Sequence, residues 1–285
     1  MSFSKIYIIV LSYNRRDDTV ECLKSLYLSD YPNFKVVMVD NASSDGSAEA
    51  VRKTFPQAEV IENSENLMYA EGNNVGIRRA IEEGADYVLL LNNDTVVSPA
   101  MLGELETAMR NNPDAGAAGA MTYYFPPKKR PEDEIIWYAG GIVSFWKGLT
   151  AHRGIRERDT GRYNNMEETG YVTGCAMMLS RECLERTGLL DPGYYIYAED
   201  ADLSVRARRA GFMLLFVPRA KVWHKVSLST GGEFSAFKIK NKIRSNLRLF
   251  LLHARPWHWL TIPFFVTARA AAFTLRRLFF FSRTP

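Results

Sequence analysis

Acidic side chains follow two of the apolar, β-branched runs in the first hundred residues. Asp40 ends one such run, and Asp94 follows another after two asparagines. A carboxylate held at the end of a buried strand loses hydration unless it binds a cation. Mg²⁺ or Mn²⁺ is the natural partner, so Asp94 is a candidate metal ligand. The alternative is a cap for a helix that begins near Pro99, but Ser98 is better placed for that role.

Asp40 is open to two interpretations. The run Asp-Asn-Ala-Ser-Ser-Asp at 40–45 favours an Asx turn that leads into a helix. A carboxylate at this place could instead accept a hydrogen bond from the N3–H of a pyrimidine, which would select uracil or thymine over a purine. The second interpretation is a hypothesis about which nucleotide base is bound.

A further acidic cluster comprises Glu199, Asp200 and Asp202, which fall within one turn at an expected helix start. Compensation of the helix dipole would stabilise the helix by about 0.3 to 1 kcal/mol per acid. The same field keeps a carboxylate ionised, and a general base must be ionised before it can take a proton. Asp200 is therefore the candidate base. His224, which ends a later apolar run, is an ordinary polar residue, a metal ligand or a partner for a phosphate.

The elements that must position these residues alternate in the manner of βαβ units, which predicts an α/β fold with a mainly parallel sheet. Strands are expected at 6–11, 36–39, 59–61, 87–91 and 214–217, and helices at 17–27, 47–55, 75–83 and from 99 and 199 onward. Residues 66–74 are expected to form a Gly- and Asn-bearing loop. Ligands of open α/β sheets bind outside the carboxyl ends of the strands, where Asp40 and Asp94 would both lie.

The chain is expected to divide into a body, residues 1–232, and a basic amphipathic helical tail, residues 233–285. Within the body, residues 122–169 are rich in Pro, Gly and Arg and are expected to be an inserted, partly mobile loop region. From Phe234 to Pro285 there are ten Lys or Arg and no Asp or Glu, although the whole chain carries only +4. The body is therefore net acidic, and the tail suits an anionic surface.

No apolar run in the tail is long enough to cross a membrane. Arg269 interrupts the apolar run 260–268 well before the roughly 20 residues that a span requires. Mixed aromatic and basic residues favour an interfacial element that contacts a membrane peripherally. The alternative is a helical pair that packs on the body or on a second copy of the chain, as in a homodimer. Nucleic-acid binding is not expected, because no recognition module is visible and the acidic body would repel phosphate.

Composition excludes several classes of protein. The 285 residues are 47% hydrophobic and 24% charged, which is typical of a globular protein and excludes global disorder and fibrous repeats. Three scattered cysteines exclude a disulfide framework and predict a reduced, cytoplasmic location. The N-terminus runs directly into a strand without the regions of a secretory signal. Neither G-x-G-x-x-G nor a Walker loop is present, which excludes dehydrogenases and P-loop enzymes of those types.

Five segments, taken in order, resemble the family 2 glycosyltransferases and most closely their rhamnosyltransferase-like branch. They are Val10-Leu-Ser-Tyr-Asn-Arg, Val39-Asp-Asn-Ala-Ser-Ser-Asp-Gly-Ser, Gly72-Asn-Asn-Val-Gly-Ile, Leu91-Asn-Asn-Asp-Thr and Tyr197-Ala-Glu-Asp-Ala-Asp-Leu. The resemblance implies a GT-A fold and an inverting, metal-dependent enzyme. It further implies transfer of rhamnose or a similar sugar from a dTDP- or UDP-linked donor. The acceptor would be a glycan or a polyprenol-linked saccharide in cell-surface polysaccharide synthesis.

The resemblance also assigns roles to individual residues. Asp40 looks like the base-binding acid, Asp94 like the metal-binding end of a D-x-D motif, and Asp200 like the catalytic base. His224 resembles the later histidine that helps hold the metal and the diphosphate. The remaining nucleotide-binding candidates are Ser12, Asn14, Arg15, Asn66, Gly72, Asn74 and Asn93, and the candidates around the acceptor are Gly174, Glu199 and Asp202, with 122–169 near the acceptor.

Two other functions stay open. A nucleotidyltransferase would make a sugar nucleotide, but such enzymes usually have a Gly-rich loop with a basic residue after the first strand, and this chain offers Arg15 without a glycine. A non-catalytic, nucleotide-binding scaffold in a polysaccharide assembly complex would keep the acidic motif only for folding. Processive relatives carry a Gln-x-x-Arg-Trp motif, whereas the only glutamine here is Gln57, so a non-processive enzyme is expected. The basic tail places the expected enzyme at the inner face of the plasma membrane.

Overall fold

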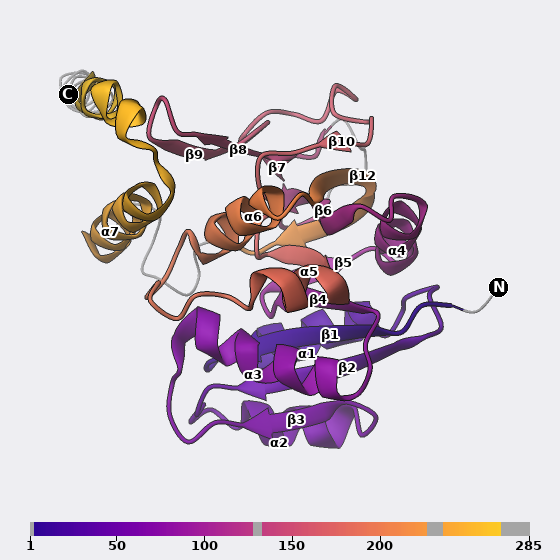
Figure 1. Ribbon diagram of the computed structural model, residues 1–285. Coiled ribbons are helices and arrows are strands. Elements are labelled where there is room, and N and C mark those ends of the chain that lie inside the picture. Colours follow the sequence, from indigo (N-terminus) through magenta and orange to yellow (C-terminus); the bar gives the residue numbers. More distant parts are fainter. Residues whose placement is uncertain (1–2, 128–132, 227–235, 269–285) are drawn as a thin grey trace, which may run out of the picture.

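The computed structural model describes residues 3–127, 133–226 and 236–268. Its main sheet has the order β10-β12-β6-β11-β4-β1-β2-β3, with β5 paired to β12 and β7 to β6, and β8 and β9 form a separate hairpin (Figure 1). The strands are β1 Ile6–Ser12, β2 Phe34–Asp40, β3 Glu59–Glu62, β4 Tyr87–Asn92, β5 Thr95–Val97, β6 Ala115–Tyr124, β7 Ile136–Tyr138, β8 Gly141–Ser144, β9 Leu149–His152, β10 Glu167–Glu168, β11 Ala176–Ser180 and β12 Met213–His224. The helices are α1 Arg16–Leu26, α2 Ser47–Thr54, α3 Met68–Glu82, α4 Met101–Asn111, α5 Arg181–Thr187, α6 Glu199–Arg209, α7 Ala236–His253 and the 3-10 helix η2 Pro256–Leu260.

Strand β1 lies between β2 and β4 and runs parallel to both. Ser12 pairs with Asp40 on one side, and Leu11 pairs with Asn92 on the other. The carboxyl ends of the three strands are therefore level. This confirms the expectation that Asp40 and Asp94 lie at one edge of a largely parallel sheet.

The core lies on both faces of the sheet, as the alternation of side chains along a strand requires. Ile6, Ile8 and Val10 face the side that α1, α2 and α4 cover. Tyr7 and Ile9 face the side that α3, α5 and α6 cover. The result is three layers, with loops gathered at the carboxyl ends of the parallel strands.

Helix α3 begins earlier than predicted. It starts at Met68, so most of the expected loop 66–74 is helical and carries Gly72 and Asn74. A Cβ on Gly72 would lie 2.6 Å from Leu11 Cδ1, so only glycine lets the helix lie this close to β1. Ser98 does not provide the expected cap either, because α4 starts at Met101 without a side-chain cap.

Residues 133–169 differ from the predicted mobile loop region, because they contain β7, β8, β9 and β10. Ile136, Tyr138 and Tyr163 bury themselves against Met121 and Tyr123 of β6 and form a small core of their own. Aromatic burial thus orders a segment whose turn residues suggested irregular structure. The basic run at 128–130 lies outside the described residues.

The C-terminal segment packs on the body through one face of α7. Leu249 and Phe250 lie against Tyr171, Tyr194 and Ala201. After η2, residues 262–268 are helical again. In the part of the chain that the structure describes, no helix combines the length and the apolar character that a bilayer crossing requires. The predicted tail beyond residue 268 lies outside the described residues.

Candidate active site

Asp94 and His224 face each other at the carboxyl edge of the sheet. His224 ends β12, which pairs with β5 so that His224 lies opposite Thr95. His224 Nε2 is 3.1 Å from Asp94 Oδ1, and the two side chains are only 9% and 13% exposed. The predicted pair of metal-ligating side chains is therefore brought together by two strands that are distant in the sequence.

The charges of this pair support each other. Burial favours the neutral carboxyl group, but the facing His224 holds the pKa of Asp94 below its usual range. Burial also disfavours the charged imidazole, yet Cys175 and Asp94 together raise the pKa of His224 well above its usual range. Without a bound cation the two groups form a buried ion pair.

The segment 173–175 joins this pair to Asp200. The Gly174 N–H donates to Asp200 Oδ2 at 2.9 Å. The next residue, Cys175, lies beside His224, and its carbonyl accepts the Asn92 N–H at 3.0 Å. Tyr69 closes the segment from α3 by donating its hydroxyl to the Gly174 carbonyl at 2.7 Å. Asp200 and Asp94 therefore border one site.

Glu199 and Asp200, in the first turn of α6, have different protonation behaviour. Burial raises the pKa of Asp200, and the N–H groups of Gly174 and Ala201 partly offset this because they bind the charged form. Burial, with the adjacent Asp200, raises the pKa of Glu199 to about 8. Oε2 of Glu199 is buried and meets no donor among the described residues. The two backbone N–H donors favour the charged form of Asp200, whereas burial and the adjacent Asp200 favour the neutral form of Glu199.

The donor groups around Asp94 fit a divalent cation that is shared with a phosphate. Within the described residues no group of three or more His, Cys, Asp or Glu side chains could hold a metal. Mg²⁺ commonly takes only one or two protein ligands and completes its shell with phosphate oxygens and water. Asp94 and His224 supply such a partial set, since octahedral ligands at about 2.1 Å from the ion lie roughly 3 Å apart.

Asn14, Arg15 and Asn93 lie at the same edge. Asn14 and Arg15 have φ values of 50° and 93°, a left-handed conformation that only well-supported non-glycine residues adopt. Asn14 Oδ1 accepts the Ser44 N–H at 3.0 Å, and Arg15 is close enough to Asp94 to favour its charged form. Asn93 donates to Thr19 Oγ1 at 2.9 Å. The β1–α1 turn thus presents Arg15 to the Asp94 site.

Asp40 forms the Asx turn. Its carboxylate accepts the Ser43 N–H at 3.2 Å and also the Ser43 hydroxyl, and the residue is 2% exposed. Contact with a pyrimidine would require Ser43 to give up part of this arrangement. The base-binding role of Asp40 stays a prediction.

Four other predicted nucleotide contacts are used within the protein. Ser12 is fully buried and bonds Thr19 Oγ1 at 3.0 Å, and Gly72 packs in the core. Asn74 is 2% exposed, and its amide bonds both the N–H and the carbonyl of Leu190. Asn66 Oδ1 accepts the Met68 N–H at 2.9 Å, which fixes the start of α3. The structure thus gives Ser12, Gly72 and Asn74 contacts within the protein, and their nucleotide-binding roles stay predictions.

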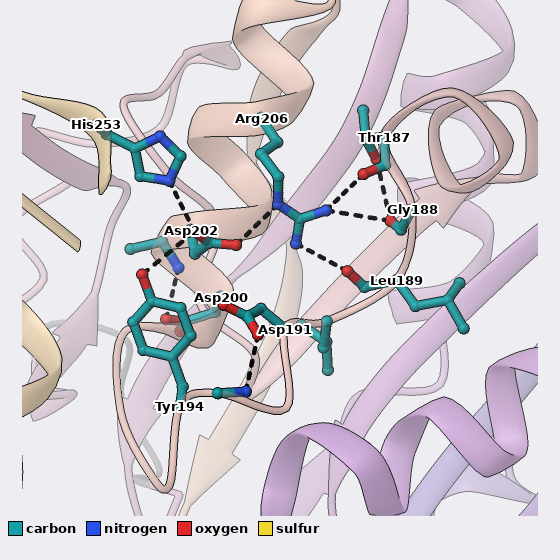
Figure 2. Close-up of polar contacts among 12 residues, drawn as sticks. Thr187, Gly188, Leu189, Asp191, Tyr194, Asp200, Asp202, Arg206 and His253 are labelled. Carbon is teal, nitrogen blue, oxygen red and sulfur yellow. Dashed lines mark hydrogen bonds and ion pairs between the residues drawn. The ribbon is translucent and has the colours of Figure 1, made fainter. Parts of the chain in front are cut away.

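Asp202 lies among the polar contacts that join α6 to its neighbours (Figure 2). Its carboxylate accepts hydrogen bonds from His253 Nε2 at 2.7 Å, Arg206 Nε at 2.8 Å and the Tyr194 hydroxyl at 3.2 Å. Arg206 also donates to the carbonyls of Thr187 and Leu189. Asp202 therefore ties α7 to α6, which is a supporting role, and its part near the acceptor stays a prediction.

Three residues at the site were not predicted. Tyr69 donates its hydroxyl to the Gly174 carbonyl, and Cys175 lies beside His224. The ring of Trp137 in β7 lies edge-on to His224, with centroids 4.7 Å apart. Trp137 falls in the region that was expected to be loop, and no local pattern reveals contacts that depend on distant strands.

The family of the chain follows from comparison with known proteins. The model of "Glycosyl transferase family 2" matches residues 7–188, more than half of the chain. The chain belongs to glycosyl transferase family 2. The N-acetylglucosaminyl-diphospho-decaprenol L-rhamnosyltransferase of Mycobacterium tuberculosis is 27% identical over 247 residues, which cover 79% of this chain and 78% of that protein. The resemblance to the rhamnosyltransferase-like branch is confirmed, and the chain is a glycosyltransferase.

Two solved structures confirm the GT-A fold. Mannosyltransferase PcManGT from Pyrobaculum calidifontis, in complex with GDP-Man and Mn²⁺, superposes with a TM-score of 0.59 at 22% identity and covers 95% of this chain and 76% of its own. GalNAc-T7 with UDP, GalNAc and Mn²⁺ gives a TM-score of 0.64 at 18% identity. The match covers 86% of this chain but 48% of the GalNAc-T7 chain. At these identities the likeness concerns the fold alone.

Proposed function

We propose that this glycosyltransferase moves rhamnose or a similar hexose from a dTDP- or UDP-linked donor to a hydroxyl of a polyprenol-linked saccharide, with inversion. The observation that carries this proposal is the 173–175 segment, which holds Asp200 and borders His224 within one short stretch of backbone. A single displacement between an alcohol and a sugar diphosphate requires a base for the alcohol and, in the same site, groups that bind the leaving diphosphate.

The reaction is a single displacement at the anomeric carbon. The acceptor oxygen forms the new glycosidic bond as the bond to the donor diphosphate breaks, and the nucleoside diphosphate leaves. Asp200 takes the proton of the acceptor hydroxyl, and attack from the opposite face inverts the configuration. Asp94 and His224 would hold Mg²⁺ or Mn²⁺, which supplies positive charge for the departing diphosphate when bound. Arg15 adds a second positive charge at this end of the site.

Substrate identity is supported by the relatives. The mycobacterial protein is named for L-rhamnose transfer to a decaprenol-linked diphosphate sugar, and the two structural neighbours hold Mn²⁺ with GDP-Man or UDP. By analogy we expect a polyprenol-linked acceptor at the inner face of the plasma membrane, reached from the cytoplasm. Asp40 would choose a pyrimidine base, if it releases Ser43.

A thermal-shift screen with dTDP-, UDP- and GDP-sugars, with and without Mn²⁺, tests the proposal first. A donor that binds the native state raises the apparent stability, and we expect a Mn²⁺-dependent shift with a dTDP- or UDP-sugar. Turnover with a polyprenol-linked saccharide should then release nucleoside diphosphate, and NMR should show an inverted anomeric centre. Release of inorganic pyrophosphate from a nucleoside triphosphate supplied together with a sugar 1-phosphate would instead indicate a nucleotidyltransferase. Binding without any release would indicate a scaffold.

A further inference from the structure

The outer face of the C-terminal segment exposes an unusual number of large apolar side chains. On α7, Ile243, Leu247, Leu251 and Leu252 are between 50% and 64% exposed. Ile243, Leu247 and Leu251 recur every four residues and so form one stripe. Leu249 and Phe250 on the opposite face are buried against the body. A surface helix with apolar residues on both faces indicates that the outer face has a partner.

The apolar surface continues past the end of α7. Trp257 is 47%, Leu260 83%, Phe264 70% and Val266 45% exposed. The β8–β9 hairpin joins this surface through Trp146, which is 53% exposed and whose carbonyl accepts a hydrogen bond from Thr261 at 2.6 Å. We call the exposed residues of α7 and 256–268, together with Trp146, the outer C-terminal face.

The charge around this face has one sign. Lys240, Lys242, Arg244 and Arg255 are exposed beside the apolar stripe, and no Asp or Glu occurs after Glu233 in the sequence. Exposed apolar side chains flanked by Lys and Arg are the pattern of helices that lie in the interface of an anionic bilayer. We propose that the outer C-terminal face docks on an anionic lipid surface, with its apolar side chains inserted among the acyl chains.

A second copy of the chain is a poorer occupant. A two-fold contact through this face would place the same basic residues of both copies against each other, with no acidic residue of the tail between them. Lipid headgroups, in contrast, bring the opposite charge, and each Lys or Arg near such a surface strengthens binding roughly fivefold. The net acidic body is repelled, which fixes how the molecule is oriented.

Docking would place the site at the membrane. Helix α7 is bonded to α6 through His253 and Asp202, and α6 begins with Glu199 and Asp200. A groove of about 370 Å³ between α7 and the 193–195 loop is lined by Tyr195 and Arg244 and shares Leu251 with the outer C-terminal face. Its use by the lipid of the acceptor rests on the proposed function, whereas lipid docking itself does not.

Co-sedimentation of the full chain with vesicles tests the proposal without any substrate. Vesicles of equal parts phosphatidylcholine and phosphatidylglycerol should bind the protein, and vesicles of phosphatidylcholine alone should bind it at least tenfold more weakly. The double variant Leu247→Glu/Leu251→Glu should lose at least tenfold in binding. Leu28→Glu changes a leucine after α1 that is 70% exposed and lies outside the outer C-terminal face, and this variant should bind as the parent does.

Point variants are needed because truncation before α7 would remove Leu249 and Phe250 and uncover Tyr171, Tyr194 and Ala201 of the body. Circular dichroism should show both glutamate variants folded, since the replaced side chains face solvent. Equal binding of the parent and the Leu247→Glu/Leu251→Glu variant would overturn the proposal. So would a dimer of the parent, detected by light scattering, that this variant converts to a monomer, because the face would then be a subunit interface.

Discussion

The Gly174 N–H donates to Asp200 Oδ2 at 2.9 Å, and this bond sets the position of the candidate base. Because Cys175 follows directly and lies beside His224, the same stretch of backbone also borders the candidate metal ligands. One short stretch of backbone thus contacts both the candidate base and a candidate metal ligand. The proposed displacement needs a base and a cation on one site, so this stretch is the first place to test it.

Asp200→Asn should abolish transfer while donor binding is retained. The amide keeps the size of the side chain and an oxygen that can accept from Gly174, but it cannot take a proton. Loss of a general base lowers kcat by about 10²–10⁴. Turnover assays and donor titration by calorimetry measure the two effects separately. Loss of donor affinity together with residual turnover would contradict the assignment.

Gly174→Ala should lower kcat sharply with little loss of overall stability elsewhere in the fold. A Cβ at this position would lie 2.5 Å from the Tyr69 hydroxyl oxygen, so either the Tyr69 ring, which bonds the Gly174 carbonyl, or the segment that holds Asp200 must shift. Misplacement of a catalytic group by about 1 Å can cost 10²-fold. Gly103→Ala in α4 is the control, because its Cβ would only approach Tyr31 at 4.0 Å. Full activity of Gly174→Ala would show that this contact does not position the base.

The expectations from sequence succeeded where local pattern determines structure. Apolar, β-branched runs gave the central strands, and parallel neighbours end together, so Asp40 and Asp94 had to share an edge. Pairing of Asp94 with His224 was suggested only by family resemblance, because it depends on how β12 and β5 meet. The contacts of Tyr69 and Cys175 are equally non-local and leave no trace in the spacing of the residues.

The wrong expectations have physical causes as well. Gly72 and its asparagine neighbours have low helix propensity. Close packing of Gly72 against Leu11 of β1 outweighs that propensity, and α3 begins at Met68. Asp200 and Asp202 are two residues apart in a helix and therefore point to different sides. Asp200 borders the site, while Asp202 accepts a bond from His253 of a helix far along the chain.

Glu199→Gln should change the pH dependence of stability. The pKa of Glu199 is raised from 4.5 to about 8 in the folded protein, so between these values the native state holds a proton that the unfolded chain has lost. Unfolding free energy must therefore fall as pH rises through this range. Gln removes the titration, and the variant should gain stability relative to the parent from pH 5 to pH 8, on the order of 1–3 kcal/mol.

Urea denaturation across this pH range measures the effect. Glu182→Gln is a matched control, because that carboxylate is 63% exposed and pairs with Arg186 at the surface. Parallel pH profiles for the parent and Glu199→Gln would show that Glu199 is ionised in the folded protein.

The acid limb of kcat/KM should lie above the ordinary pKa of an aspartate, because burial raises the pKa of Asp200.

Asp94→Asn and His224→Ala should each weaken binding of the donor only when a divalent cation is present. Both remove a ligand from a set that holds few protein groups, so the affinity for Mn²⁺ with nucleotide should fall at least tenfold. Calorimetric titration of a dTDP- or UDP-sugar with Mn²⁺ and with EDTA separates the two states. If EDTA leaves the parent's donor affinity and turnover unchanged, the cation has no part in the reaction.

Asp202→Asn should destabilise the protein, because His253 Nε2 and Arg206 Nε lose a charged acceptor at 2.7 Å and 2.8 Å in the interior. Removal of one member of a buried ion pair costs about 3 kcal/mol or more. Glu185→Gln is the control: it makes the same chemical change in an exposed pair with Arg181, with side chains 51% and 44% exposed, and should cost less than about 0.5 kcal/mol. Urea midpoints measure both. If Asp202→Asn only frees α7 to trypsin and the midpoint and turnover are unchanged, the C-terminal helix is an accessory and not a part of the catalytic fold.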